Sequence, residues 1–288
     1  MRQQRLTTTF AWLVLGTCST LTSPTTSVWA DSPTAAIDVS NATADTPEQR
    51  AATAIQSGKE RSADAVTQLA DWLADDNTIV RQSAAWALTQ LGDAAEPALK
   101  PLIQAVSDRD ARVRWAAATT LGHLGKKAED AEAVLVRAVH DRDADVQCAA
   151  IIALRSIEIT DERKVSAALS DCLKDESSDV QAEALATLAA LMPRCGETTK
   201  QDLVPRLTKA LSTKNDEVRL ATVVLLGDLG LAAAPAIAPL TYAKFRALGR
   251  SQSLFLTRIF TRISKNNRAA QSCPHFHCYC GSMPAVRV

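Results

Sequence analysis

The sequence predicts an all-α protein, a right-handed α-α superhelix of about five stacked helical hairpins with degenerate ends. The first observation is a repeat, because one valine recurs at intervals of 33, 33, 34 and 38 residues. These valines are Val80, Val113, Val146, Val180 and Val218. The second observation is a composition that is 47% hydrophobic but only 4% aromatic, which favours small side chains on helices over strands.

The third observation is the helical spacing of the residues around each valine. Small or apolar residues follow at plus 4, plus 8 and plus 11, which draws one stripe along a helix. Three residues before the valine stand side chains that can cap a helix N-terminus, namely Asn77, Asp110, Asp143, Ser177 and Asn215. Gly92, Gly125 and Gly230 stand at plus 12, where a left-handed turn would end the helix.

A partner helix precedes each valine, with apolar residues at minus 11 and minus 7, such as Leu102 and Val106. Pro97, Pro101 and Pro205 fall near the expected starts of these helices, where a missing N–H is harmless. Each unit is therefore a pair of antiparallel helices joined by an acidic turn. A single pair cannot cover its apolar face, so the units must stack.

The stretches SDRDARVRWAAATTLGHLG (107–125) and HDRDADVQCAAIIAL (140–154) resemble HEAT repeats of the type named after phycobilisome lyase subunits. The resemblance covers residues 47–242 and implies a ladder in which a turn aspartate and an arginine bond between successive units. The matching residues are Asp75, Asp108, Asp141 and Asp175, with Arg81, Arg114 and Arg219. The pattern lapses at Gln147, Gln181 and Thr213, which implies a looser fifth unit.

The two ends differ from the repeats. Residues 1–30 are typical of a signal peptide, with Arg2 and Arg5 before a short apolar run, so we expect export to the periplasm or the extracellular space. The alternative is a lipoprotein anchored at Cys18. Residues 31–46 are predicted to be a flexible linker.

Residues 243–288 form a basic tail with eight Lys and Arg and no Asp or Glu. Three interpretations of this tail remain open: a degenerate cap on the last unit, a segment that contacts an anionic membrane, or a non-native end produced by an altered reading frame.

No catalytic or metal site is predicted. The tail gathers Cys273, His275, His277, Cys278 and Cys280, but these ligand types crowd into eight residues without a second knuckle. The DRDAD stretch at 141–145 lacks the glycine and the twelfth-position acid of a calcium loop. Neither His123 nor His140 precedes a glutamate, so the paired His-Glu motifs of deoxyhypusine hydroxylase, an iron enzyme with similar repeats, are absent. We expect no cofactor.

Charge and surface pattern indicate protein partners. Residues 31–243 carry 22 Lys and Arg against 32 Asp and Glu, a net charge of −10, which disfavours nucleic acid. Positions plus 2, plus 6 and plus 9 of the second helices predict an interaction face on the concave side of a monomer. Its residues are Trp86, Trp115, Thr119, Ile152, Arg155, Leu220 and Val224, although neighbouring helices could equally bury them.

The predicted function is that of an exported HEAT-repeat scaffold without catalysis of its own. The family resemblance implies an alternative, in which the protein is an accessory subunit of a lyase-like enzyme that handles a bilin chromophore, or of another enzyme complex. By the same analogy, the protein itself would have lyase-like or oxidoreductase activity. Export speaks against the bilin alternative, because phycobilisomes assemble in the cytosol.

Overall fold

The computed structural model describes residues 46–211, 213 and 215–229, and the chain divides into two compact units, 1–191 and 192–288. Every regular element within the described ranges is a helix. The predicted all-α class is therefore confirmed.

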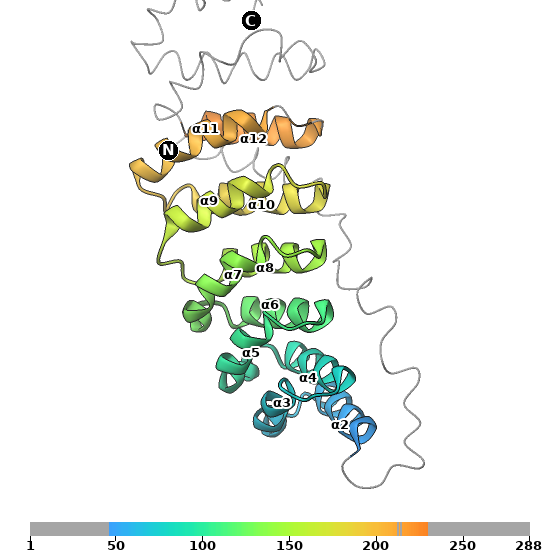
Figure 1. Cartoon of the computed structure of the whole chain (residues 1–288). Helices are drawn as coiled ribbons and strands as arrows, with labels where there is room; N and C mark the ends of the chain where they lie inside the picture. Colours follow the sequence, from blue (N-terminus) through green and yellow to red (C-terminus); the bar gives the residue numbers. More distant parts are fainter. Residues whose placement is uncertain (1–45, 212, 214, 230–288) are drawn as a thin grey trace, which may run out of the picture. The chain divides into compact units, whose positions relative to one another are not determined.

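Unit 1 consists of two layers of helices (Figure 1). The layer that contains the second helix of each hairpin, here the B layer, comprises α2 (Pro47–Glu60), α4 (Thr78–Leu91), α6 (Ala111–Leu124), α8 (Ala144–Ser156) and α10 (Ser178–Leu191). The A layer comprises α3 (Val66–Trp72), α5 (Leu99–Ala105), α7 (Glu132–Ala138) and α9 (Glu162–Cys172). Successive helices of the B layer pack against one another, as expected for stacked hairpins.

The B-layer helices begin at the predicted capping residues. Asn77 accepts a hydrogen bond from the amide of Ile79 at 2.8 Å, and Asp110 accepts one from Arg112 at 2.9 Å. Gly92 and Gly125 follow α4 and α6 with φ of 56° and 55°. Their ψ values of −122° and −127° lie outside the left-handed helical region that the sequence led us to expect. Only glycine adopts this conformation readily, so these residues end the helices.

The A layer is less regular than predicted. Its first three helices are short and follow 3-10 segments, η5 (Ala63–Ala65), η6 (Gly92–Ala98) and η7 (Gly125–Ala131). Pro97 lies inside η6 and has no N–H to donate to an α-helical ladder. Ala128 in η7 has non-helical angles, with φ of −103° and ψ of 31°. These irregular segments turn the chain from the B layer back to the A layer.

The core of unit 1 consists of the residues that define the repeat. Val80, Val113, Val146 and Val180 are fully buried, and so are the leucines at plus 8, namely Leu88, Leu121, Leu154 and Leu188. Glycine permits close packing of B-layer helices at two places. A Cβ at Gly58 would lie 2.8 Å from the Cα of Ala87, and one at Gly122 would lie 3.1 Å from the Cα of Ala153.

Unit 2 contains one described hairpin, α11 (Glu197–Ala210) and α12 (Asp216–Asp228), whose helices pack against each other. Asn215 caps α12 by accepting from the amide of Glu217 at 3.0 Å. Pro205 lies well inside α11, so its predicted place near the helix start is wrong, because the helix begins earlier, at Glu197.

Residues 1–45 and 230–288 lie outside the described part of the chain. The predictions of a signal peptide, an anchor at Cys18, a linker and a basic tail with its cysteines and histidines therefore stay predictions. Within the described residues, no helix combines the length and the apolar character that a membrane crossing requires.

Candidate partner-binding face

A ladder of arginine and aspartate side chains joins successive hairpins of unit 1. Arg81 donates through Nε to Oδ2 of Asp108 at 2.9 Å, and through Nη1 to the Asp75 carbonyl at 2.9 Å. Arg114 repeats this pattern with two bonds of 2.8 and 2.7 Å to the Asp141 carboxylate. Each arginine therefore binds the turn of its own hairpin and the carboxylate of the next one.

The aspartates of the ladder also hold their own turns. Oδ1 of Asp75, Asp108 and Asp141 accepts the backbone N–H two residues later, at 2.8, 2.8 and 3.0 Å. Arg114 is buried, and its hydrogen bond to Asp141 raises the pKa of the guanidinium. Since such paired, two-pronged contacts favour one geometry, the ladder sets the stacking of neighbouring hairpins.

The ladder weakens at glutamine. Gln147 donates a single bond of 3.1 Å to Asp175, and Gln181 donates to the Asp175 carbonyl at 2.6 Å. In unit 2, Arg219 donates to the carbonyl of Thr213 at 2.8 Å. In the hairpin that contains α8, the single hydrogen bond from the Gln147 side chain therefore replaces the two hydrogen bonds that an arginine makes to the next aspartate.

The sequence pattern did not predict one arginine–aspartate contact of the ladder. Arg50 in α2 donates to Asp75 at 2.9 Å, so α2 occupies the place of a second helix in front of the first predicted hairpin. Gln49 stands where the other second helices have the repeat valine. The available signal was the arginine itself, which stands 31 residues before Arg81.

The residues predicted to form the interaction face differ in exposure. Trp86, Thr119 and Ile152 are half-buried and Arg155 is exposed. Trp115, in contrast, is only 6% exposed, so its predicted place on the face is corrected. Because α4 and α8 pack on both sides of α6, this side chain is covered as part of the layer. Leu220 and Val224 are half-buried on α12 and belong to unit 2.

The face carries carboxylates on α8 and α10. Burial raises the pKa of Asp145, and the charges of Asp143 and Asp179 raise it further. Burial, with Glu183 and Asp179 nearby, raises the pKa of the Cys148 thiol to about 12. Arg155 offsets part of this charge through an ion pair of 3.5 Å with Glu183. This end of the face is therefore locally acidic.

Glu132 is a buried charged residue that the sequence pattern did not single out. It lies at the start of α7, and its carboxylate accepts from the hydroxyl of Thr160 at 2.8 Å and from the amide of Asp161 at 3.1 Å. These bonds hold the connection between α8 and α9, where Ile157 is extended instead of a helix-ending glycine. Glu132 thus positions a loop.

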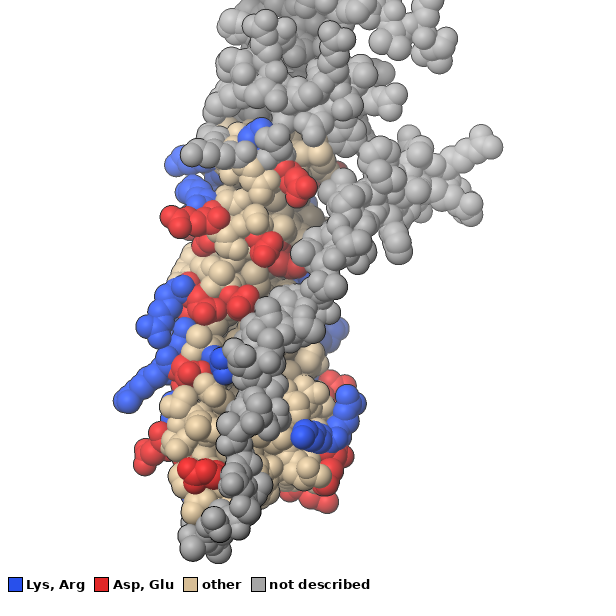
Figure 2. Space-filling model, turned by 90° about the vertical axis from the view of Figure 1, so that its right-hand side faces the viewer, with Lys and Arg blue, Asp and Glu red and all other residues tan. Residues whose placement is uncertain are grey.

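The described residues hold no group of three or more His, Cys, Asp or Glu side chains arranged to bind a metal ion. His123 and His140 are both exposed, and Cys148, Cys172 and Cys195 are buried cysteines that form no disulfide with a described residue. Where described residues are visible in Figure 2, basic and acidic side chains lie in separate groups among uncharged ones. The described part therefore offers a surface of mixed polarity.

Family models match this chain over half of its length. A model of HEAT repeats matches residues 99–189 and 166–244, and a model of the PBS lyase HEAT-like repeat matches residues 80–108. No curated protein matches the chain.

Solved structures share the fold. The chain is 20% identical to an engineered protein with a TM-score of 0.52, covering 71% of this chain and 97% of that one. It is 19% identical to a designed armadillo repeat protein in complex with the peptide (KR)4, with a TM-score of 0.51 and coverage of 69% and 99%. The complex of CpcE and CpcF of phycocyanin lyase from Nostoc sp. PCC7120 is 22% identical, with a TM-score of 0.42 and coverage of 78% and 97%. The likenesses to the engineered protein and to the designed armadillo repeat protein show the helical repeat fold alone.

Proposed function

Because the chain belongs to the HEAT-repeat family, we propose that it is an exported scaffold that binds another protein along the B layer of unit 1. It catalyses no reaction itself in this proposal. Trp86 and Ile152 carry the proposal, since both are half-buried apolar side chains on the B layer, and α8 and α10 of the same layer also carry the carboxylates Asp145 and Asp179. Aromatic and aliphatic anchors within a polar rim are typical of protein interfaces.

The ladder supports this function because a partner that meets a preformed surface loses little binding energy to ordering. Arg81 and Arg114 hold the B-layer helices in a fixed stacking through buried contacts. The designed armadillo repeat protein of similar fold is in complex with a peptide, which is an instance of this use of stacked helical hairpins. The net charge of −10 in residues 31–243 also favours protein over nucleic acid as the partner.

The test is affinity capture of the mature protein from its own cell envelope after mild cross-linking, read by quantitative mass spectrometry. The double variant Trp86→Ala and Ile152→Ala should lose at least one protein that the wild type enriches. Its matched control is Ile103→Ala with Val136→Ala, which trims half-buried apolar side chains of the A layer. Identical partner lists for wild type and both variants would refute binding along the B layer.

Export is part of the proposal and has its own experiment. The arginines before a short apolar run and the Val28-Trp29-Ala30 end of that segment support it. Cell fractionation with N-terminal sequencing should find a product that begins at Asp31 outside the cytoplasm. A cytoplasmic product that retains Met1 would refute export, and a lipid-modified Cys18 would select the lipoprotein route.

The alternative role as an accessory subunit of a bilin lyase stays a prediction from the family resemblance. No contact or charge among the described residues favours it.

A further inference from the structure

A surface cavity of about 420 Å³ lies between two successive hairpins of unit 1, at the edge formed by their turns. One wall comes from the first hairpin, with Ser107 and Asp108 of its turn. The other comes from α7 and the following turn, with Arg137 and Arg142. We call this cavity the basic notch. Arg114 of α6 also lines the notch, but none of the residues predicted for the interaction face does.

The notch has an excess of positive charge that the ladder does not use. Asp108 is paired with Arg81, and Asp141 is paired with Arg114, so both carboxylates in the lining are already neutralised. Arg137 and Arg142 form no ion pair with any residue that the structure describes, and both are exposed. Two guanidinium groups are therefore left to attract an anion.

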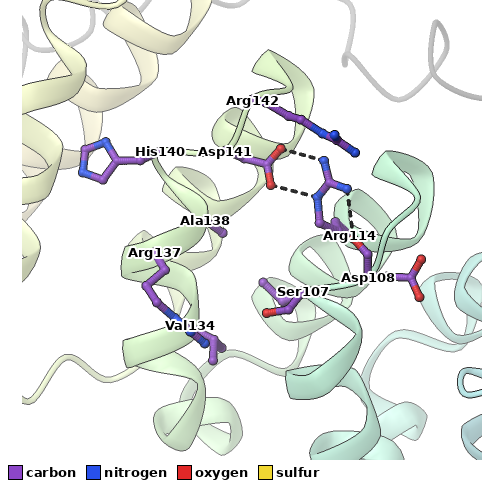
Figure 3. Close-up of a pocket in the computed structure, with 10 residues that line it drawn as sticks. Ser107, Asp108, Arg114, Val134, Arg137, Ala138, His140, Asp141 and Arg142 are labelled. Carbon is purple, nitrogen blue, oxygen red and sulfur yellow. Dashed lines mark hydrogen bonds and ion pairs between the residues drawn. The ribbon is translucent and has the colours of Figure 1, made fainter.

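The position of Arg142 is constrained. Its Nη2 donates to the backbone carbonyl of Arg109 at 3.1 Å, which ties the turn of one hairpin to the turn of the hairpin before it. Figure 3 shows Arg142 next to the Arg114–Asp141 pair, whereas Arg137 extends along α7 toward Val134. The two guanidinium groups thus lie at opposite ends of the labelled cluster, with Ser107 on the facing wall.

The same positions in neighbouring hairpins have different charges. In the next hairpin, Asp171 and Glu176 stand at the repeat positions of Arg137 and Arg142. In the preceding hairpin these positions hold Gln104 and Arg109. The pair of arginines without an ion-pair partner among the described residues is therefore a local feature of this hairpin and does not follow from the repeat itself.

We propose that the basic notch binds an acidic segment of a partner protein, with one carboxylate at Arg137 and a second at Arg142. Guanidinium groups bind carboxylates through two parallel N–H donors, and a segment with two separated acids matches two separated arginines. We favour an acidic protein segment over a polyphosphate chain because residues 31–243 carry a net charge of −10, which repels a continuous polyanion more than a segment with two acids. The inference depends on the proposed function only in that the solenoid binds other proteins.

The test measures binding of a rhodamine-labelled hexaglutamate peptide to the mature full chain by fluorescence anisotropy at low salt. The double variant Arg137→Gln and Arg142→Gln should weaken binding about tenfold, since it removes two charge-assisted contacts. The double variant Lys59→Gln and Lys100→Gln removes the same charge from exposed positions elsewhere and should leave affinity within about twofold. Circular dichroism verifies that each variant is folded.

Several results would overturn the inference: no binding of hexaglutamate, an equal loss in both double variants, or tighter binding of a labelled oligouridylate with the same dependence on Arg137 and Arg142. The last result would assign the notch to phosphate. Lysine at both positions should restore only part of the affinity, because an ammonium lacks the paired donors. Failure here leaves the envelope capture experiment untouched, since that experiment uses B-layer variants.

Discussion

Replacement of Arg114 by glutamine tests whether the ladder sets the stacking of the hairpins. Arg114 makes two bonds to the Asp141 carboxylate, of 2.8 and 2.7 Å, and two to carbonyls of its own turn, of 3.0 and 3.2 Å. The side chains of Arg114 and Asp141 are only 7% and 13% exposed. Glutamine at this position would resemble Gln147, which reaches its aspartate with one bond.

The expected loss follows from these contacts. Removing one partner of a fully buried pair costs about 3–5 kcal/mol, because the remaining charge stays buried. Here Asp141 keeps the amide of Asp143 at 3.0 Å, and glutamine keeps one donor. We therefore expect Arg114→Gln to lower the free energy of unfolding of unit 1 by about 2–3 kcal/mol.

Tryptophan fluorescence during urea unfolding measures this loss selectively. Trp72, Trp86 and Trp115 lie in unit 1, and residues 192–288 contain no tryptophan. The matched control is Arg112→Gln, which changes the free energy by no more than about 0.5 kcal/mol, since Arg112 forms no ion pair with a described residue. Equal effects of the two substitutions would refute the role given to the ladder.

The converse substitution, Gln147→Arg, adds a second contact to Asp175 and should stabilise unit 1 by about 1 kcal/mol in the same assay. Glu132→Ala leaves the amide of Asp161 and the hydroxyl of Thr160 without their acceptor and should cost about 2–3 kcal/mol, whereas Glu132→Gln should cost less. Asp145→Asn should raise stability at pH 7. The pKa of Asp145 is raised in the folded state, so the stability gained by the asparagine variant should decrease as the pH falls through that pKa. Below about pH 3.9 the carboxyl group is protonated in both the folded and the unfolded chain, and the gain should be absent. A gain in stability that is unchanged at low pH would contradict this account. With a thiol pKa of about 12, only about one ten-thousandth of Cys148 should be thiolate at pH 8. Iodoacetamide should therefore label Cys148 of the native protein very slowly, as measured by peptide-resolved mass spectrometry. Fast labelling would show that the thiol is accessible and reactive.

Much of the fold follows from local residue spacing. The repeat valines, the leucines at plus 8 and the capping residues were predicted correctly, because a helix places side chains at fixed angles and its first amides need a nearby acceptor. The irregular A layer was not predicted. The effect of Pro97 and Ala128 depends on how the chain returns from one layer to the other.

The candidate site was predicted only in part. Trp115 has the same place in its repeat as residues that stay more exposed, and its burial depends on the close approach of the helices on both sides. The role of Glu132 depends on a loop 28 residues away, and the sequence offers no periodic signal for such a contact.

By itself, the sequence determined that this protein is a stack of helical hairpins with capped second helices, because those properties depend on residues within one or two turns of each other. Only the tertiary structure decided which charged side chains find an ion-pair partner when the hairpins stack. Arg50 and Arg114 are each paired with an aspartate of another hairpin, whereas Arg137 and Arg142 line a cavity and form no ion pair with a described residue. The physical reason is that an ion pair depends on distance in space, which residue type and spacing do not specify.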